Sequence, residues 1–342
     1  MIKSPPMTIA AQPIEEHYTD PTDLPDVFCT DTLAAFCKAA GDPLRLEILR
    51  VLRHNAYGVL ELSQLFEVKQ SGMSHHLKVL ANAGLVATRR EGNSIFYRRA
   101  PLPVEPALQE LHRHLFATID LLELSSALQQ RIDLTNQERT KASREFFGQN
   151  ADRFHANQDL IAGYTQYGEI VTEFLDATSV RKDVVLEVGP GEGGFLPSLS
   201  KRFSQVIALD TSDEMLSRSR KITEKQRLPN VQLVHGDTSL ALEQQLTANC
   251  ITLNMVLHHT PDPAHIFEDL AQLLTPGGVL LVTDLCHHDQ SWAREACGDL
   301  WLGFEPDDLS NWASAAGLAE GESLYLAQRN GFQIQLRQFF NH

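Results

Sequence analysis

The sequence predicts two domains: a mostly α-helical domain that ends in a β-hairpin, followed by an α/β domain with a doubly wound sheet. Three observations support this fold class. The chain has 342 residues, whereas one domain usually has roughly 100–200. Short helical patterns and one hairpin occupy residues 28–100, and strands alternate with helices from about residue 183 onward. Hydrophobic residues make up 43% and charged residues 21% of the chain, which is typical of a folded protein.

The charge is unevenly distributed along the chain. The formal net charge is −15, which by itself disfavours a nucleic-acid partner. Between residues 69 and 99, however, six basic side chains stand against Glu91 alone. A local basic patch is typical of a DNA-contacting face, because only the contacting face has to neutralise phosphates. From charge alone, a merely solvated basic face is an equally good interpretation.

Several sequence features bear on the compartment. No apolar run approaches the ~18 residues that a membrane span needs, and the N-terminus has no apolar signal-peptide core. The five cysteines are scattered and form no CxxC pair, which argues against a disulfide framework or a zinc cluster. We therefore expect a cytoplasmic protein that does not engage a membrane.

Residues 28–105 are expected to form the helical domain, after a flexible, proline-rich tail over residues 1–27. Asp42 and Pro43 suit the N-cap and the first position of a helix. Over residues 71–80, apolar side chains recur at helical spacing and are expected to point inward. Polar and basic side chains are left outward, as a helix in the major groove of DNA requires. These outward side chains are Ser74, His75 and Lys78.

Two strands at 85–90 and 94–99 then predict a hairpin with basic arms, which can lie along a phosphate backbone. Helix, turn, polar helix and basic hairpin is the order of a winged helix-turn-helix. Residues 31–100 resemble the ArsR family of winged-helix repressors in "GDPLRLEILRVL", "SGMSHHLKVLANAGLV" and "RREGNSIFYR". The resemblance implies that a homodimer binds double-stranded operator DNA. It assigns Ser71, Ser74, His75, His76 and Lys78 to the recognition helix and Arg89, Arg90 and Tyr97 to the wing.

The sequence departs from the metal-sensing members of that family. They carry a paired cysteine motif where this chain has Leu60-Glu61-Leu62-Ser63, and thiolates are the ligands that soft metals require. His112, His114 and Asp120 could mimic a second metal site of the family, but their spacing is poor and surface histidines are the better interpretation. We therefore predict no metal in this domain.

Residues 106–142 are expected to form a dimerisation and linker helix. Apolar residues spaced three and four apart form one stripe along it: Leu108, Leu111, Leu115, Ile119 and Leu122. A single long helix over about 107–135 would then connect the dimer seam to a second domain over residues 143–342.

The second domain begins its sheet with a buried strand at 183–188 that runs into the glycine-rich turn 189–194. Such a turn lets a ligand approach the backbone at the start of a helix. The next strand ends at Asp210, whose carboxylate can accept both hydroxyl protons of a ribose. Later strands are expected at 231–235, 250–256 and 279–284, with a closing hairpin at 323–327 and 332–336. The order predicts a Rossmann-like fold with its ligand at the carboxyl ends of the strands.

The ligand could be a dinucleotide or S-adenosylmethionine. Glu192, at the mouth of the turn, would repel a pyrophosphate, whereas Glu187 and Asp210 suit a cationic amine and a ribose. Residues 143–340 resemble class I S-adenosylmethionine-dependent methyltransferases in "EVGPGEGG", "HGD" and "NMVLHHTPDP", with a departure at Asn249, where many relatives have an acid. The resemblance assigns Glu187, Gly189 and Gly191 to the methionine portion, Asp210 to the ribose, Asp237 to the adenine amine and Asn254 to the region near the amino acid.

The His258-His259 pair invites a metal interpretation. Adjacent residues of an extended segment point to opposite sides, so we expect no shared ion and no metal site. Acidic, histidine and cysteine side chains over residues 284–289 border the expected acceptor pocket, but a structural role is favoured for them and no catalytic residue is assigned.

As a whole, the chain resembles an ArsR-type regulator fused to a methyltransferase domain. The leading hypothesis is a homodimeric transcriptional regulator whose second domain binds S-adenosylmethionine or S-adenosylhomocysteine as effector, which would link transcription to methyl-cycle metabolism. The alternative is an active methyltransferase of unknown acceptor that its winged helix localises or autoregulates. Methyl transfer by proximity needs no catalytic group when the acceptor is already nucleophilic, so the sequence leaves both open.

Overall fold

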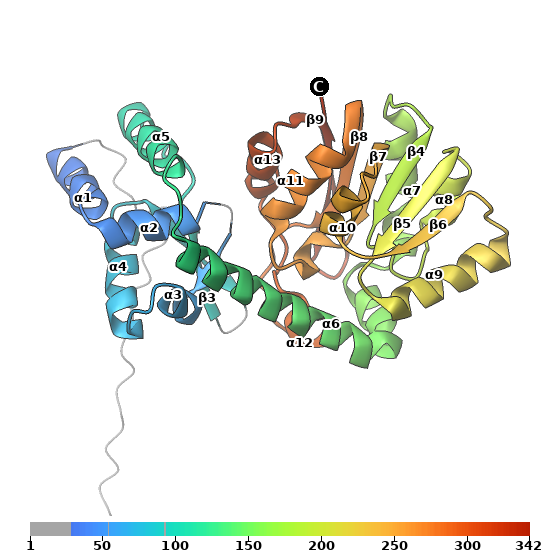
Figure 1. Ribbon diagram of the computed structural model, residues 1–342, viewed down its shortest axis with the longest axis horizontal. Coiled ribbons are helices and arrows are strands. Elements are labelled where there is room, and N and C mark those ends of the chain that lie inside the picture. Colours follow the sequence, from blue (N-terminus) through green and yellow to red (C-terminus); the bar gives the residue numbers. More distant parts are fainter. Residues whose placement is uncertain (1–28, 54, 92–93) are drawn as a thin grey trace, which may run out of the picture.

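The computed structural model describes residues 29–53, 55–91 and 94–342, arranged as a smaller helical domain and a larger α/β domain (Figure 1). The predicted tail over residues 1–27 lies outside the described residues. A long helix, α6 (Ser126–Ala162), runs from the helical domain along the α/β domain (Figure 1). No helix among the described residues is long and apolar enough to cross a membrane.

The N-terminal core contains four helices that precede the wing hairpin: α1 (Thr30–Ala40), α2 (Pro43–Val51), α3 (Val59–Leu65) and α4 (Gln70–Asn82). The Asp42 side chain accepts a hydrogen bond from the Arg45 backbone N–H at 3.0 Å, and Pro43 occupies the first turn, so α2 begins as predicted. The inward residues of α4, namely Met73, Leu77 and Leu80, are fully buried in this core.

A three-stranded sheet forms the wing, in the order β1 (Tyr57–Gly58), β3 (Ser94–Arg99), β2 (Val86–Glu91). The antiparallel register of the predicted hairpin pairs Arg89 with Phe96 and Val86 with Arg99. Helix α4 and the wing therefore follow one another in the predicted order.

The predicted long helix is two helices, α5 (Pro106–Asp120) and α6, separated by residues 121–125. Polar side chains cause the break. The Arg50 guanidinium donates to the Leu122 carbonyl at 3.1 Å just past the end of α5, and the Ser125 hydroxyl accepts from the Leu128 N–H at 3.2 Å to cap α6. The apolar stripe packs largely on the domain's own core, while Leu122 remains 54% exposed.

The α/β domain is built on a seven-stranded sheet in the order β6-β5-β4-β7-β8-β10-β9. Neighbours from β6 to β8 are parallel, and the last two strands are antiparallel. This confirms the predicted Rossmann-like sheet with its closing hairpin. The strands are β4 (Val184–Val188), β5 (Gln205–Asp210), β6 (Val231–His235), β7 (Ala248–Asn254), β8 (Leu274–Leu285), β9 (Ala319–Ala327) and β10 (Gln333–Phe340).

Helices cover both faces of this sheet because successive strand residues point to opposite sides. On β4, Val185 faces one core with helices α7 and α8, whereas Leu186 faces a second core with α10, α11 and α13. The elements are α7 (Tyr164–Ala177), α8 (Leu196–Ser200), α9 (Asp213–Gln226), α10 (Thr238–Glu243), the 3₁₀ helix η2 (Leu257–His259), α11 (Pro263–Leu273), α12 (Trp292–Cys297) and α13 (Pro306–Ala315).

The two domains share buried apolar contacts. Phe96, on the wing strand β3, is 8% exposed and belongs to the core of the α/β domain that contains α11 and α13. Its ring meets the Trp301 ring edge to face, with centroids 5.6 Å apart. The wing is thus packed on the α/β domain.

Candidate functional site

The glycine-rich turn after β4 lies at the carboxyl edge of the parallel strands, where ligands of such sheets bind. Gly189 and Gly191 both adopt left-handed backbone conformations, with φ of +67° and +55°. A Cβ on Gly189 would come within 2.6 Å of the Val256 side chain, whereas a Cβ on Gly191 would meet nothing within 4 Å. Gly189 is therefore needed for close packing, and Gly191 faces open space that a ligand can use.

Glu187, the predicted acid at the end of β4, is 2% exposed. Thr252 donates a hydrogen bond to one carboxylate oxygen, and the Asn254 amide donates to the other at 3.1 Å. Burial raises the pKa of Glu187 to about 8, although these two hydrogen bonds favour the ionised form. The structure thus joins two predicted cofactor residues, Glu187 and Asn254, in one buried contact.

Asp210 ends β5 beside the glycine-rich turn. One carboxylate oxygen accepts the Ser212 backbone N–H at 2.8 Å, and the Gly189 N–H donates to the neighbouring Leu209 carbonyl at 2.8 Å. Burial raises the pKa of Asp210 to about 6, against backbone hydrogen bonds from Ser212 and Gly191 that lower it. At neutral pH the carboxyl group of Asp210 is largely ionised and can accept hydrogen bonds from hydroxyl groups.

Asp237 follows the next strand and lines an open pocket of about 430 Å³ together with Thr211, His235, Gly236, Ser239, Leu240 and Glu243. Its carboxylate also caps α10 by accepting the Leu240 N–H at 3.0 Å. Because β5 and β6 are neighbours and Asp210 pairs with His235 in register, this pocket continues the edge that begins at the glycine-rich turn.

Glu192 has a local partner that sequence reasoning missed. The Arg218 guanidinium on α9 lies 2.8 Å from its carboxylate. The negative charge at the mouth of the turn is therefore partly balanced, so the predicted repulsion of a pyrophosphate is weaker than the sequence suggests.

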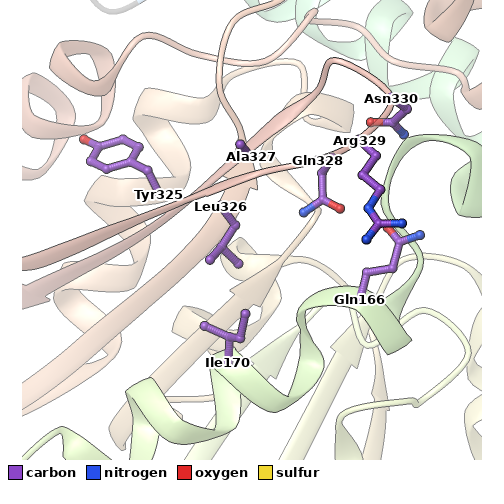
Figure 2. A pocket seen from close by; sticks show the side chains of 8 residues that line it. All are labelled: Gln166, Ile170, Tyr325, Leu326, Ala327, Gln328, Arg329 and Asn330. Atoms are coloured by element: carbon purple, nitrogen blue, oxygen red, sulfur yellow. The ribbon is translucent and has the colours of Figure 1, made fainter.

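A larger pocket, about 580 Å³, lies between α7 and the end of the β9–β10 hairpin (Figure 2). Gln166 and Ile170 contribute from α7, and Tyr325, Leu326, Arg329 and Asn330 are among the residues on the hairpin side. None of the predicted cofactor residues lines this pocket. The candidate cofactor site is therefore the smaller pocket with the adjoining glycine-rich turn.

Helix α4 presents the face that the sequence predicts. Ser71, Ser74, His75 and Lys78 are exposed, and His76 is half-buried with its Nδ1 3.8 Å from the Asp42 carboxylate. Exposed hydroxyl, imidazole and ammonium groups on one helix offer donors and acceptors to base edges and phosphates.

The wing residue Arg89 lies differently from the sequence expectation of an exposed basic arm. Arg89 is only 9% exposed, and its guanidinium lies over the Trp301 and Phe304 rings, 5.7 and 5.6 Å from their centroids. The Asp308 carboxylate at the start of α13 lies 3.6 Å from Arg89 and also pairs with Arg98. In this arrangement Arg89 is held by the α/β domain rather than offered to a phosphate.

The other predicted wing residues have separate environments. Tyr97 is half-buried beside the helical core. Arg90 lies on β2, and its side chain is outside the described part of the structure.

Arg139 of α6 is a further interdomain residue that the sequence did not reveal. Its guanidinium contacts Glu61, donates to the Ala56 carbonyl at 3.1 Å and to the Pro261 carbonyl at 3.3 Å. It also lies 5.2 Å from the centroid of the Trp301 ring. Single arginines and tryptophans carry no periodic signal, so the sequence offers nothing that pairs them across domains.

His258 and His259 do not point to opposite sides, contrary to the sequence expectation. These residues lie in the 3₁₀ helix η2 and not in an extended segment, so their rings turn to the same side, with centroids 3.9 Å apart. Both approach Asp299, which follows α12. The other suggested metal group does not converge. The expected surface position is wrong for His112, which is buried between Phe36 and Phe116, whereas His114 is exposed near Glu110.

Asp284, expected to border an acceptor pocket, is fully buried. Its carboxylate accepts the Leu257 and Leu285 N–H groups at 2.9 and 2.8 Å and lies 2.7 Å from His258 Nδ1. These contacts support the structural role that the sequence favoured for it.

Two family models match the chain. A model described as a methyltransferase domain matches residues 155–335, and one described as a bacterial regulatory protein of the arsR family matches residues 42–88. These matches confirm the resemblances identified from the sequence motifs, and with the sheet order they establish a helix-turn-helix region followed by a methyltransferase fold.

Curated relatives match parts of the chain. The ubiquinone biosynthesis O-methyltransferase of Xanthomonas axonopodis pv. citri (strain 306) is 27% identical over 190 residues, covering 51% of this chain and 78% of that protein. An uncharacterized 37.1 kDa protein in transposon TN4556 of Streptomyces fradiae is 34% identical over 112 residues, covering 32% of each chain.

Solved structures resemble the chain at lower identity. The N-methyltransferase NodS from Bradyrhizobium japonicum WM9, in complex with S-adenosyl-l-homocysteine, has a TM-score of 0.43 and 16% identity, covering 55% of this chain and 98% of that one. The [4+2]-cyclase SpnF has a TM-score of 0.47 and 10% identity, covering 58% of this chain and 94% of that one.

Proposed function

This chain belongs to the methyltransferase-domain family and carries an ArsR-type helix-turn-helix ahead of that domain, and we propose that it is a DNA-binding transcriptional regulator whose methyltransferase domain binds S-adenosylmethionine or S-adenosylhomocysteine as its effector. The observation that carries this proposal is the burial of the wing residue Arg89 against Trp301, Phe304 and Asp308 of the methyltransferase domain. DNA-contacting and ligand-binding modules that share buried side chains can influence one another.

A continuous set of contacts supports the coupling. Asn254, which holds Glu187, is followed by Met255 in a left-handed conformation (φ +58°) and then by the 3₁₀ helix η2. The His258 carbonyl accepts the Trp301 N–H at 3.1 Å, and the Trp301 indole donates to the Thr260 carbonyl at 2.7 Å. A ligand that shifts the segment after β7 would therefore shift the ring on which the wing packs.

The effector follows from the chemistry of the carboxyl edge. Buried Glu187 suits the cationic amine, ionised Asp210 suits the ribose hydroxyls, and Asp237 in the adjoining pocket suits the adenine amine. The open space beside Gly191 allows the methionine portion to approach the backbone, while Gly189 lets the same turn pack against Val256. Only S-adenosylmethionine carries a sulfonium charge, so the two ligands should differ in their effect near Glu187.

Operator binding by a homodimer is part of this proposal. Leu108, Leu111 and Leu115 on α5 are only half-buried against their own domain, which leaves apolar surface for a second copy. Two copies would place two α4 helices on half-sites about one helical turn of DNA apart. Because its proposed partner is operator DNA, we expect the protein in the cytoplasm.

The proposal is tested by releasing the wing. Asp308→Asn removes the charge that holds Arg89 and Arg98 but keeps an oxygen to cap α13, where Asp308 accepts the Glu305 N–H at 3.1 Å. We expect this variant of the full chain to bind DNA about 5- to 10-fold more tightly, corresponding to about 1–1.4 kcal/mol. The probe is the duplex that the wild-type chain enriches from a random library.

Asp307→Asn is the matched control, because it makes the same charge change one residue away on an exposed position. We expect it to bind DNA like the wild type. Equal affinities of the Asp308→Asn and Asp307→Asn variants would contradict the sequestered wing, and a wild type that enriches no duplex would contradict the DNA-binding function itself.

An active methyltransferase remains the second candidate, favoured by the 27% identity to proteins named ubiquinone biosynthesis O-methyltransferases. On that hypothesis the acceptor is an oxygen nucleophile such as a phenol. The full chain, supplied with S-adenosylmethionine and a panel of catechols, would then release S-adenosylhomocysteine over many turnovers, and Asp210→Ala would abolish that release. A regulator without enzymatic activity would bind the cofactor and give no turnover.

A further inference from the structure

Three side chains with metal-binding atoms converge behind the interdomain interface. His258 and His259 come from η2 and Asp299 from the turn after α12, and one ligand atom of each lies within 4.8 Å of the others. Asp299 Oδ1 lies 3.9 Å from His258 Nε2 and 3.6 Å from His259 Nδ1. The side chains of His258 and Asp299 are fully buried, and that of His259 is 10% exposed.

Two features of the fold fix this group. Asp284 Oδ1 lies 2.7 Å from His258 Nδ1 and holds the ring so that Nε2 faces Asp299. His258 Nε2 has no hydrogen-bond partner among the described residues. Gly298, with φ of +73°, turns the chain sharply between α12 and Asp299, and a Cβ there would come within 2.3 Å of the Phe146 ring.

A carboxylate on one imidazole nitrogen with the other nitrogen aimed at further ligands is the usual arrangement around a protein-bound metal. The carboxylate fixes the tautomer and makes the ligating nitrogen more basic. The Asp284 carboxylate contacts Nδ1 of His258 in this way, and the Leu257 and Leu285 N–H groups donate hydrogen bonds to Asp284 itself. The arrangement thus includes the ligands and the groups that orient one of them.

We propose that His258, His259 and Asp299 form a binding site for one divalent zinc ion, with Asp284 as the group that orients His258. Zinc binds imidazole nitrogen and carboxylate oxygen at about 2.0–2.2 Å, so neighbouring ligands of a tetrahedral ion are about 3.4 Å apart. The separations of 3.6 and 3.9 Å need only small side-chain rotations to reach this value. Imidazole and carboxylate ligands suit zinc better than magnesium or calcium, which prefer oxygen alone.

The bound ion would have a structural role at the domain interface. It would join η2 to the turn that leads into Trp301, whose N–H already donates to the His258 carbonyl. Because Trp301 supports the wing, zinc binding would strengthen the docked arrangement of the two domains. The site does not depend on the proposed effector or on DNA binding, so its test is independent of both.

The test uses Zn²⁺ alone as the probe and the full chain, stripped with a chelator and then dialysed against buffered zinc. Elemental analysis should give one additional retained zinc per wild-type chain relative to His259→Gln and Asp299→Asn. His265→Gln is the matched control, since His265 also lies 3.4 Å from a carboxylate but is 56% exposed at the surface. We expect this control to retain zinc like the wild type.

Equal zinc retention by the wild type and His259→Gln would overturn the site, as would a wild type that retains none. In that case the cluster is an ion-pair group without a metal. If the variants fail to fold, replacing zinc with Co²⁺ still tests the site, because this measurement needs only the wild-type chain. Intense visible absorption of a four-coordinate ion supports the site, and the weak absorption of a six-coordinate hydrated ion overturns it.

Discussion

Glu187 is the residue at which the electrostatics of the proposed cofactor site are most unusual. Its carboxyl is almost fully buried, and burial raises its pKa to about 8. The unfolded chain ionises this group near pH 4.5. Between these two values the folded state holds a proton that the unfolded state has lost, so Glu187 lowers the free energy of unfolding as pH rises from about 4.5 to 8.

The same carboxyl predicts proton release on ligand binding. A cationic amine beside Glu187 favours the ionised form, so S-adenosylmethionine should displace up to about one proton near pH 7 and bind more tightly as pH rises toward 8. Calorimetry in buffers of different ionisation enthalpy measures that release. The ligand's own amino group titrates near pH 8 and also releases protons. The wild type is therefore compared with Glu187→Gln, which should not release the proton that comes from Glu187. Identical proton release in both proteins would contradict the assignment.

At this scale, single residues were predictable where a motif surrounds them and unpredictable where only a distant partner defines their role. Glu187 and Asn254 lie at the ends of buried strands, and the structure joins them. The resemblance to the ArsR family and the basic hairpin predict that Arg89 lies on a DNA-contacting wing, whereas its environment is set by Trp301 and Asp308, more than 200 residues away. No periodicity or spacing in the sequence relates such residues.

Helix α4 is the element expected to read DNA. Lys78 is exposed on its outer face, so we expect Lys78→Ala to weaken binding to the enriched duplex and to all other duplexes by a similar factor. The logarithmic salt dependence of affinity should become shallower by about one, the contribution of one phosphate contact. Fluorescence anisotropy at several salt concentrations measures this slope. Lys201→Ala, which removes an exposed cation from the other domain, should leave it unchanged, and an unchanged slope in Lys78→Ala would remove the helix from the interface.

Most elements were predictable because hydrophobic periodicity and turn residues determine them locally. The presence of five parallel strands and a closing hairpin follows from alternating strand and helix patterns, and α2 begins after Asp42 as its capping pattern predicts. The break between α5 and α6 was missed because an apolar stripe continues across it. A side chain from another element, Arg50, captures the Leu122 carbonyl, and the Ser125 hydroxyl begins the new helix. The η2 turn was missed because a two-histidine segment carries no helical period.

At the scale of the whole molecule, the helix-turn-helix and the methyltransferase fold share a buried interface rather than only a linker. Phe96 belongs to a core of the methyltransferase domain, and Arg139 of α6 bonds to both domains. Loss of this interface would expose Phe96 and Trp301, so its release on DNA binding needs a compensating ligand or DNA contact. We therefore expect the proposed ligand site and the proposed DNA-binding face to be coupled.

We propose that the adenosyl-ligand site and the DNA-binding face are coupled, and measuring ligand affinity with and without DNA tests this coupling most directly. Calorimetry would give the affinity of the full chain for S-adenosylmethionine and for S-adenosylhomocysteine, each with and without a saturating amount of the enriched duplex. We predict that DNA changes the affinity for at least one ligand by about tenfold, or about 1.4 kcal/mol, and changes the two unequally. Ligand affinities that are the same with and without DNA would contradict the account.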